Sequence, residues 1–180
     1  MKVLAMTGSP NQKGSSTTLV NQILAGAKAA GHEVEELDVE TLSVNGCKEC
    51  MYCRTNNADC IQQDDLKDYW DKLRQADVLI VSSPNYYSTV TGPMITFMNR
   101  HYCLKDASRN SRIPGGKKLI GVFSQGNPDE QGYVANYDWY LNCFASLGME
   151  VVDKLICTGT TSLEEDSEMM KRAFNLGKNL

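Results

Sequence analysis

The sequence predicts a three-layer α/β fold, in which helices cover both faces of a doubly wound, five-stranded parallel sheet. Short apolar runs alternate along the chain with stretches whose apolar residues recur at helical spacing, the pattern of successive strand–helix units. The run Val78–Val81 is apolar throughout, as expected of a parallel strand covered on both faces. A length of 180 residues suits one domain with a sizeable core. We therefore expect a single domain over residues 1–180.

The first half of the chain is expected to contain three strands, at residues 3–6, 33–38 and 78–81. An apolar stripe over residues 19–27 predicts a helix that ends near Gly31. Asp64 or Asp65 is expected to cap a helix before the third strand. Between these elements, residues 39–63 are predicted to form an irregular insertion loop that carries four cysteines.

The second half continues the alternation. Gly92-Pro93 is expected to open a helix that runs to about Tyr102, and the polar residues 105–116 to form a loop. Strands are predicted at 118–123 and 151–157, and helices at about 129–147 and 163–178. The apolar stripe over 133–147 is expected in the core, with its tyrosines available to a subunit interface, and His101 is expected to pack or cap near a helix end.

Composition and charge exclude several classes of protein. The net charge of −4 disfavours a nucleic acid as the main partner, and no apolar run approaches the ~20 residues of a membrane span. The N-terminus lacks the charged and apolar regions of a signal peptide. Seven cysteines without export signals indicate the reducing cytoplasm, and thiol or metal chemistry rather than disulfides.

The segment Met6–Thr18 is the most informative in the chain. It is a Gly- and hydroxyl-rich loop between a buried strand and a helix start, where free N–H groups and the helix dipole favour an anion, usually phosphate. Gly14 is followed by Ser15-Ser16 rather than Lys-Ser/Thr, which excludes a nucleoside-triphosphate loop, and the third glycine of a dinucleotide fingerprint is missing. Two interpretations stay open: a site for a single phosphate, and a turn capped by Ser15 or Ser16 that binds nothing.

Two further loops are expected beside it, because ligands of such sheets lie beyond the carboxyl ends of the strands. One follows the third strand over residues 82–89, and the other follows the fourth strand over residues 124–128. Asn85, Tyr86 and Tyr87 offer hydrogen bonds and planar aromatic surface. Together the loops suit a planar heterocycle with one phosphate tail, a description that fits flavin mononucleotide (FMN) better than ATP or NAD.

Gly8-Ser9-Pro10 followed by Gly14–Thr17, with Ser83–Tyr87 and Gly92-Pro93, resembles the flavodoxin-like NAD(P)H-dependent FMN reductases. Within them the chain looks most similar to the branch that contains the iron–sulfur flavoproteins. The resemblance covers residues 1–160, and the two motifs at this spacing are more specific than either alone. It implies a flavodoxin-like FMN-binding domain. It also implies a homodimer or homotetramer with the flavin near the interface, where the cysteine loop can complete a neighbour's site.

The resemblance assigns cofactor-binding residues position by position. Five residues of the first loop would hold the FMN phosphate, four of the second would line the isoalloxazine edge and ribityl chain, and three of the third would close the other side. In chain order these are Ser9, Asn11, Ser16, Thr17 and Thr18; Pro84, Asn85, Tyr86 and Tyr87; and Ser124, Gln125 and Gly126. Many relatives have Arg at position 11, so the loss of a charge-assisted contact predicts weaker FMN binding here.

Cys47, Cys50, Cys53 and Cys60 form a C-x₂-C-x₂-C-x₆-C motif. Four thiolates at this spacing can ligate a [4Fe–4S] cluster. A Cys₄ zinc site is a weaker alternative, because such sites usually pair two C-x₂-C units across a longer gap. The pattern looks common in relatives that are plain flavin reductases, so free thiols that pack the loop stay an open alternative. The other three cysteines stand in apolar contexts and are expected to be small buried residues: Cys103, Cys143 and Cys157.

The leading hypothesis is a cytoplasmic, FMN-dependent oxidoreductase. It would take a hydride from NAD(P)H and reduce a quinone, an azo or nitro compound, free flavin or a redox partner. The hydride step requires no dedicated acid–base residue, so no catalytic side chain is expected. The alternative is an iron–sulfur flavoprotein that carries electrons through FMN and a [4Fe–4S] cluster. A third hypothesis is a non-catalytic binding or regulatory protein, for which failure to bind FMN would be the signature.

Overall fold

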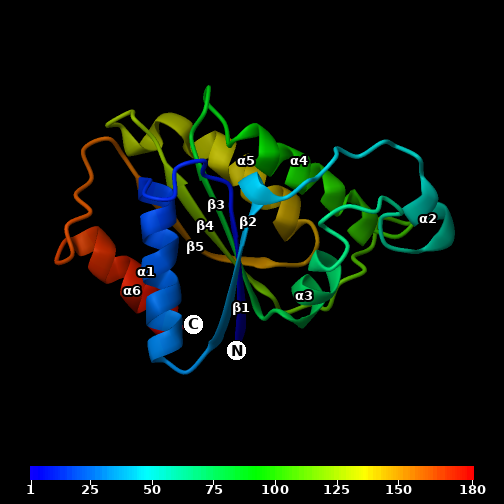
Figure 1. Ribbon diagram of the computed structural model, residues 1–180, viewed down its shortest axis with the longest axis horizontal. Helices are drawn as coiled ribbons and strands as arrows, with labels where there is room; N and C mark the ends of the chain where they lie inside the picture. Colours follow the sequence, from blue (N-terminus) through cyan, green and yellow to red (C-terminus); the bar gives the residue numbers. More distant parts are fainter.

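The computed structural model describes residues 1–180, and its centre is a sheet of five parallel strands in the order β2-β1-β3-β4-β5 (Figure 1). The order places β1 beside β3, so the chain winds outward in both directions from this pair and leaves a switch point between them. The strands are β1 Lys2–Thr7, β2 Glu33–Asp38, β3 Val78–Pro84, β4 Lys118–Ser124 and β5 Glu150–Cys157.

Helices cover both faces of the sheet (Figure 1). On one face lie α1 (Ser15–Ala29) and α6 (Glu168–Lys178), and on the other lie α3 (Tyr69–Gln75), α4 (Gly92–Arg100) and α5 (Val134–Ala145). The short α2 (Tyr52–Asn56) sits away from the sheet, and 3₁₀ turns occur at η1 (Val39–Thr41), η2 (His101–Leu104) and η3 (Glu130–Tyr133). None of the helices has the length and apolar character needed to cross a membrane.

Alternate residues of the strands enter two separate cores, because successive side chains of a strand point to opposite faces. In β1, Val3 and Ala5 pack with residues of α1 and α6, whereas Leu4 and Met6 pack with residues of α3, α4 and α5. Helices cover both faces of the sheet, so side chains on both faces of the central strands are buried. This is why these strands appear as continuous apolar runs in the sequence.

The predicted fold is confirmed, but two helix starts are wrong. Helix α3 begins at Tyr69 rather than at residue 64 or 65, because Asp64 forms an ion pair with Arg100 instead of capping a helix. Helix α6 begins five residues later than expected, where Ser167 Oγ accepts the Met170 N–H and caps it. The segment 39–63 is also not wholly irregular, since it contains η1 and α2.

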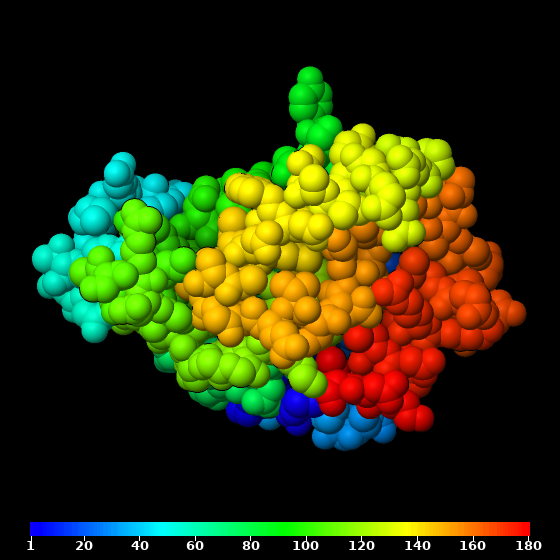
Figure 2. Space-filling view, turned by 180° about the vertical axis from the view of Figure 1, so that it is seen from behind, coloured from blue at the N-terminus to red at the C-terminus, as the bar shows by residue number.

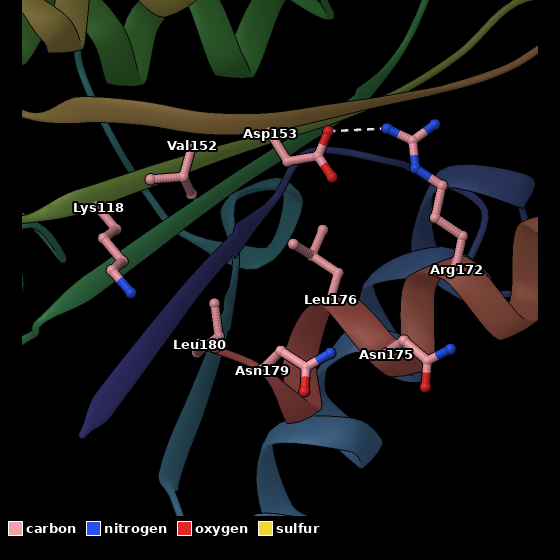
Figure 3. Close-up of a pocket in the computed structure, with 8 residues that line it drawn as sticks. All are labelled: Lys118, Val152, Asp153, Arg172, Asn175, Leu176, Asn179 and Leu180. Atoms are coloured by element: carbon pink, nitrogen blue, oxygen red, sulfur yellow. Dashed lines mark hydrogen bonds and ion pairs between the residues drawn. The ribbon is translucent and has the colours of Figure 1, made fainter.

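Parallel pairing brings the three predicted loops to one edge of the sheet. Thr7 of β1 pairs with Ser82 of β3, and Pro84 of β3 pairs with Ser124 of β4. A hollow at the other end of β4 and β5 has no residue in common with these loops; Figure 3 shows its ion pair between Asp153 and Arg172, at 2.8 Å. The candidate site therefore lies at the carboxyl edge of the sheet.

Candidate functional site

The first loop leads into α1, whose N-terminus lies at this edge of the sheet and has no side-chain cap. Gly14 is the N-cap of α1, and no side chain caps the helix. The backbone N–H groups of Ser15, Ser16 and Thr17 have no acceptor within the protein, and the first turn has no acidic residue. The alternative of a turn capped by Ser15 or Ser16 is therefore wrong. Three N–H groups and the positive end of the dipole are available to an anion.

Ser16 provides the sharpest observation at this site. Its side chain is 0% exposed, yet Oγ has no hydrogen-bond partner. An unpaired buried hydroxyl costs on the order of 1–3 kcal/mol, and a ligand oxygen at this position would relieve that cost. A phosphate bound at a helix N-terminus presents such an oxygen. The loop therefore fits the phosphate of FMN.

Ser9, Asn11 and Thr17 build the loop itself. The Ser9 and Thr17 hydroxyls both donate to Asn11 O, at 3.1 and 3.3 Å. Asn11 Oδ1 accepts the Lys13 N–H at 3.0 Å, which leaves the exposed amide NH₂ of Asn11 for a ligand. Thr18 is half-buried in the first turn of α1. These residues thus stand at the predicted phosphate site, but two of their hydroxyls already shape the loop.

Thr91, which sequence reasoning missed, joins the first loop to the second. Thr91 Oγ1 donates to Gly8 O at 2.9 Å, and the Thr91 N–H donates to Ser83 Oγ at 2.9 Å. A Cβ at Gly8 would stand 2.0 Å from Met94 Cγ, so glycine is needed for the loop to pass this close to α4. The available signal for Thr91 was its place directly before the Gly92-Pro93 helix start.

The second loop presents two tyrosines to solvent on a braced turn. Tyr86 is 52% exposed and Tyr87 is fully exposed, and the segment stands clear of the surface in Figure 2 (green). Tyr87 and Ser88 have φ angles of 54° and 71°, a left-handed conformation that is uncommon for such residues. Asn85 Oδ1 holds this turn by accepting the Ser88 N–H at 3.1 Å. Pro84 and Asn85 are half-buried at its base.

The third loop is tied to the second through Tyr137 on α5. Tyr137 donates to Gln125 Oε1 at 2.9 Å, and Asn85 Nδ2 donates to the Tyr137 oxygen at 3.1 Å. Gln125 is buried, Ser124 is half-buried and Gly126 is exposed. Burial raises the pKa of Tyr137, so its hydroxyl keeps its proton. The expectation that this tyrosine is available to a subunit interface is wrong, because it is fully buried.

The four motif cysteines line one pocket beside the end of α4, together with buried Cys103. Cys47 and Cys50 are exposed, Cys60 is half-buried and Cys53 is buried. Burial raises the pKa of Cys53 and that of Cys103, the latter to about 12. No group of three or more metal-ligating side chains is arranged to hold a metal ion. The cysteines are therefore gathered in one place, but as they stand they do not form a closed ligand set.

Arg100, at the end of α4, holds both ends of the segment that carries the four motif cysteines, residues 45–64, called the cysteine segment below. Its guanidinium pairs with Asp64 and donates to Asn45 O at 2.8 Å, and both charged side chains are buried. Burial acts to raise the pKa of Asp64, but the hydrogen bond and charge of Arg100 outweigh it and lower the pKa. Sequence reasoning missed this pair, because it assigned Asp64 to a helix cap.

The fold has close counterparts among solved structures. An NAD(P)H:quinone oxidoreductase from Methanothermobacter marburgensis superposes with a TM-score of 0.78 over 99% of this chain and 96% of that one, at 18% identity. An azoreductase from Bacillus anthracis gives a TM-score of 0.74 over 100% of both chains, at 16% identity. Identities this low show a shared fold, which confirms the flavodoxin-like architecture.

Two relatives found by sequence similarity are named iron-sulfur flavoproteins. An iron-sulfur flavoprotein from Archaeoglobus fulgidus is 26% identical over 182 residues, which cover 100% of this chain and 79% of that protein. An iron-sulfur flavoprotein from Methanocaldococcus jannaschii is 33% identical over 122 residues, which cover 68% of this chain and 60% of that protein. The chain thus spans only part of the length of each.

A family model described as NADPH-dependent FMN reductase matches residues 1–160. The matched range includes the three loops at the carboxyl edge and the whole cysteine segment. The structure adds a helix N-terminus and a buried, unpaired serine hydroxyl that fit a phosphate. The chain therefore belongs to the NADPH-dependent FMN reductase family and is a flavin-dependent oxidoreductase.

Proposed function

We propose that this protein takes a hydride from NAD(P)H and reduces a small-molecule acceptor such as a quinone, an azo or nitro compound or free flavin. The observation that carries the proposal is the buried, unpaired Ser16 hydroxyl beside three N–H groups without acceptors. These groups match the oxygens of a phosphate, and the family match identifies its carrier as FMN. The quinone and azo acceptors are supported by the activities named for the two structural neighbours.

FMN supplies the redox chemistry when bound, as acceptor and donor of a hydride. The residues of this chain bind and orient it. The first turn of α1 would hold the phosphate through Ser16 and its neighbouring N–H groups. Asn85 and Gln125 would line the ring from opposite loops, and Tyr86 would offer an aromatic face beside it. We assign no catalytic side chain.

Titration of the apo protein with FMN, followed by flavin fluorescence, tests the proposal. Ser16→Ala should weaken FMN binding about tenfold or more, since a hydrogen bond to a charged group contributes about 1.5–3 kcal/mol. The same change should not destabilise the apo protein, because it removes a hydroxyl that has no partner. Ser146→Ala is the control, because it also removes one hydroxyl, but from the C-terminal end of α5 rather than from α1. Unchanged FMN affinity in Ser16→Ala would contradict the phosphate assignment. A wild-type protein that binds no FMN would favour the non-catalytic hypothesis.

A second candidate function is an electron carrier with FMN and a [4Fe–4S] cluster. One observation favours it: Cys47, Cys50, Cys53 and Cys60 line a single pocket. The two sequence relatives described above are named iron-sulfur flavoproteins. Because the thiols do not yet form a ligand set, the segment would have to close around a cluster. We therefore propose these four cysteines as conditional ligands and assign no step to the cluster.

An absorption spectrum of protein purified without oxygen, with iron and sulfide assays, separates the two candidates. About four irons per chain would support the cluster. Flavin bands without iron would instead support the alternative that the four cysteines are free thiols that pack the loop. Cys50→Ser should then abolish iron binding and leave FMN in place. Cys143→Ser is the matched control, because Cys143 lies outside the cysteine pocket.

We further propose a cytoplasmic homodimer or homotetramer, in which a redox protein is an alternative electron acceptor. Exposed Tyr86, Tyr87 and Trp139 support a subunit contact near the flavin loops. Seven free cysteines suit a reducing compartment.

A further inference from the structure

We propose that Tyr137 is a positioning residue that orders the side-chain amides of Asn85 and Gln125, where the second and third loops meet, and so sets the orientation of the flavin beside them, an inference that rests on the FMN site proposed above. Tyr137 lies on α5, outside all three loops, and is fully buried. Its hydroxyl oxygen contacts one side chain from each loop, Asn85 and Gln125.

The donors and acceptors of the two hydrogen bonds at the Tyr137 hydroxyl can be assigned in only one way. Gln125 Nε2 donates to two backbone carbonyls of its own loop, at 3.2 and 2.7 Å, which uses both amide protons and leaves Oε1 as an acceptor. Tyr137 must therefore donate to Oε1, at 2.9 Å, and accept from Asn85 Nδ2, at 3.1 Å. Asn85 Oδ1 is then left to accept the Ser88 N–H that holds the exposed turn.

This order fixes the orientation of both side-chain amides. If the amide of buried Gln125 rotated, its polar atoms would lose their partners, at a cost on the order of 1–3 kcal/mol. The backbones of the two loops are already joined, because the Asn85 N–H donates to Ser124 O at 2.6 Å, so what depends on the Tyr137 oxygen is the orientation of the two side-chain amides. The ring of Tyr137 is held as firmly, because it stacks on Phe123 with centroids 4.3 Å apart and planes 2° from parallel.

Tyr140 on the same helix is a matched control. It is also fully buried and packs edge-on against Phe123, with centroids 6.4 Å apart. Its hydroxyl donates to Met94 O at 3.1 Å, on α4 rather than on either loop. Tyr137→Phe and Tyr140→Phe each delete one buried hydroxyl from α5, and only the former cuts the side-chain link between Asn85 and Gln125.

The test compares wild type and the two variants as full chains, by FMN titration and by visible circular dichroism of the flavin at saturation. Tyr137→Phe should weaken FMN binding about tenfold and change the flavin dichroism, which reports the asymmetry of the surroundings of the ring. Tyr140→Phe should stay within about twofold of wild type and keep its spectrum. A merely structural role would lower the thermal midpoint of both variants and leave the spectrum at saturation unchanged.

Asn85→Ala tests the same link from its half-buried end. If Asn85 acts on the flavin through Tyr137, the double variant will lose less affinity than the product of the two single losses. The inference is overturned by losses that multiply, or by a Tyr137→Phe protein that matches Tyr140→Phe in affinity and spectrum. A wild-type protein that binds no FMN would overturn the proposed function instead.

Discussion

Buried polar atoms without partners are rare in folded proteins, and each requires an explanation. In this protein the side chains that carry them are Ser16, Ser82, Arg54, Gln62 and Arg100. The two serines lie at the carboxyl edge of the sheet, and the other three lie in or beside the cysteine segment. The unpaired atoms therefore fall at the two places where the sequence predicts a cofactor.

His101 predicts how stability responds to acid. Burial lowers its pKa from 6.5 to about 4, while Nδ1 contacts Phe97 O at 2.9 Å and Nε2 contacts the Tyr69 hydroxyl at 2.7 Å. Below pH 6.5 His101 is protonated in the unfolded chain, whereas in the folded chain it becomes protonated only near pH 4. The contribution of neutral His101 to the free energy of unfolding is therefore complete above pH 6.5, and it falls by about 3 kcal/mol as the pH drops from 6.5 to about 4.

Urea unfolding at a series of pH values measures this slope. His101→Gln should flatten it between pH 6.5 and 4, although the variant is less stable at neutral pH because it loses packing against Phe97 and Phe144. An equal slope in wild type and His101→Gln would show that another group controls acid stability.

At the scale of elements, two glycines allow helices α1 and α6 to pack with their backbones in contact. A Cβ at Gly26 would stand 2.0 Å from Phe174 O, and a Cβ at Gly177 would stand 1.8 Å from Ile23 O. Neither atom is the end of a flexible side chain, so the helices would have to move apart. The layer that covers one whole face of the sheet thus depends on two missing methyl groups.

Gly177→Ala should destabilise the protein by at least about 2 kcal/mol, despite the better helix propensity of alanine, because overpacking a closed contact outweighs that gain. Denaturant unfolding measures the change. Gly115→Ala is the control, since a Cβ there meets nothing within 4 Å; it should change stability by less than about 0.5 kcal/mol. Equal effects of the two substitutions would contradict the close helix contact.

A buried ion pair between Asp64 and Arg100 holds one end of the cysteine segment against α4. Asp64→Asn leaves the Arg100 guanidinium buried without its charge partner, a change that typically costs about 3–5 kcal/mol. We expect the segment between Asn45 and Asp64 to open, so that thiol-specific reagents modify Cys53 faster while FMN affinity stays the same.

Glu168→Gln removes one partner of an exposed pair with Lys171 and is the control, because such pairs contribute little. Reaction kinetics with a chromogenic disulfide read out the opening. Unaltered thiol reactivity in Asp64→Asn would mean that other contacts hold the segment.

For the molecule as a whole, the sequence predicted what depends on local pattern and on parallel topology. Strand positions, layers and the meeting of three loops follow from periodicity and from strands that end at one edge. Thr91, Tyr137 and Arg100 could not be predicted, because their partners lie 83, 52 and 36 residues away in the chain. Helical spacing correctly placed Tyr137 in an apolar stripe, but it gave no information on what its hydroxyl would contact.

The exposed turn of the second loop predicts how copies of this chain assemble. Tyr87 is fully exposed on a turn that Asn85 and Asn136 hold by hydrogen bonds, so the projection is fixed before any partner binds. Burying such a ring against a second copy would contribute about 2 kcal/mol. Sedimentation velocity over a range of concentrations should therefore show an oligomer whose dissociation constant rises about tenfold or more in Tyr87→Ser. Val152→Ser, on β5, removes an exposed apolar side chain elsewhere and should leave the dissociation constant unchanged. A wild-type monomer at all concentrations would contradict the proposed assembly, and equal effects of both variants would move the interface away from this turn.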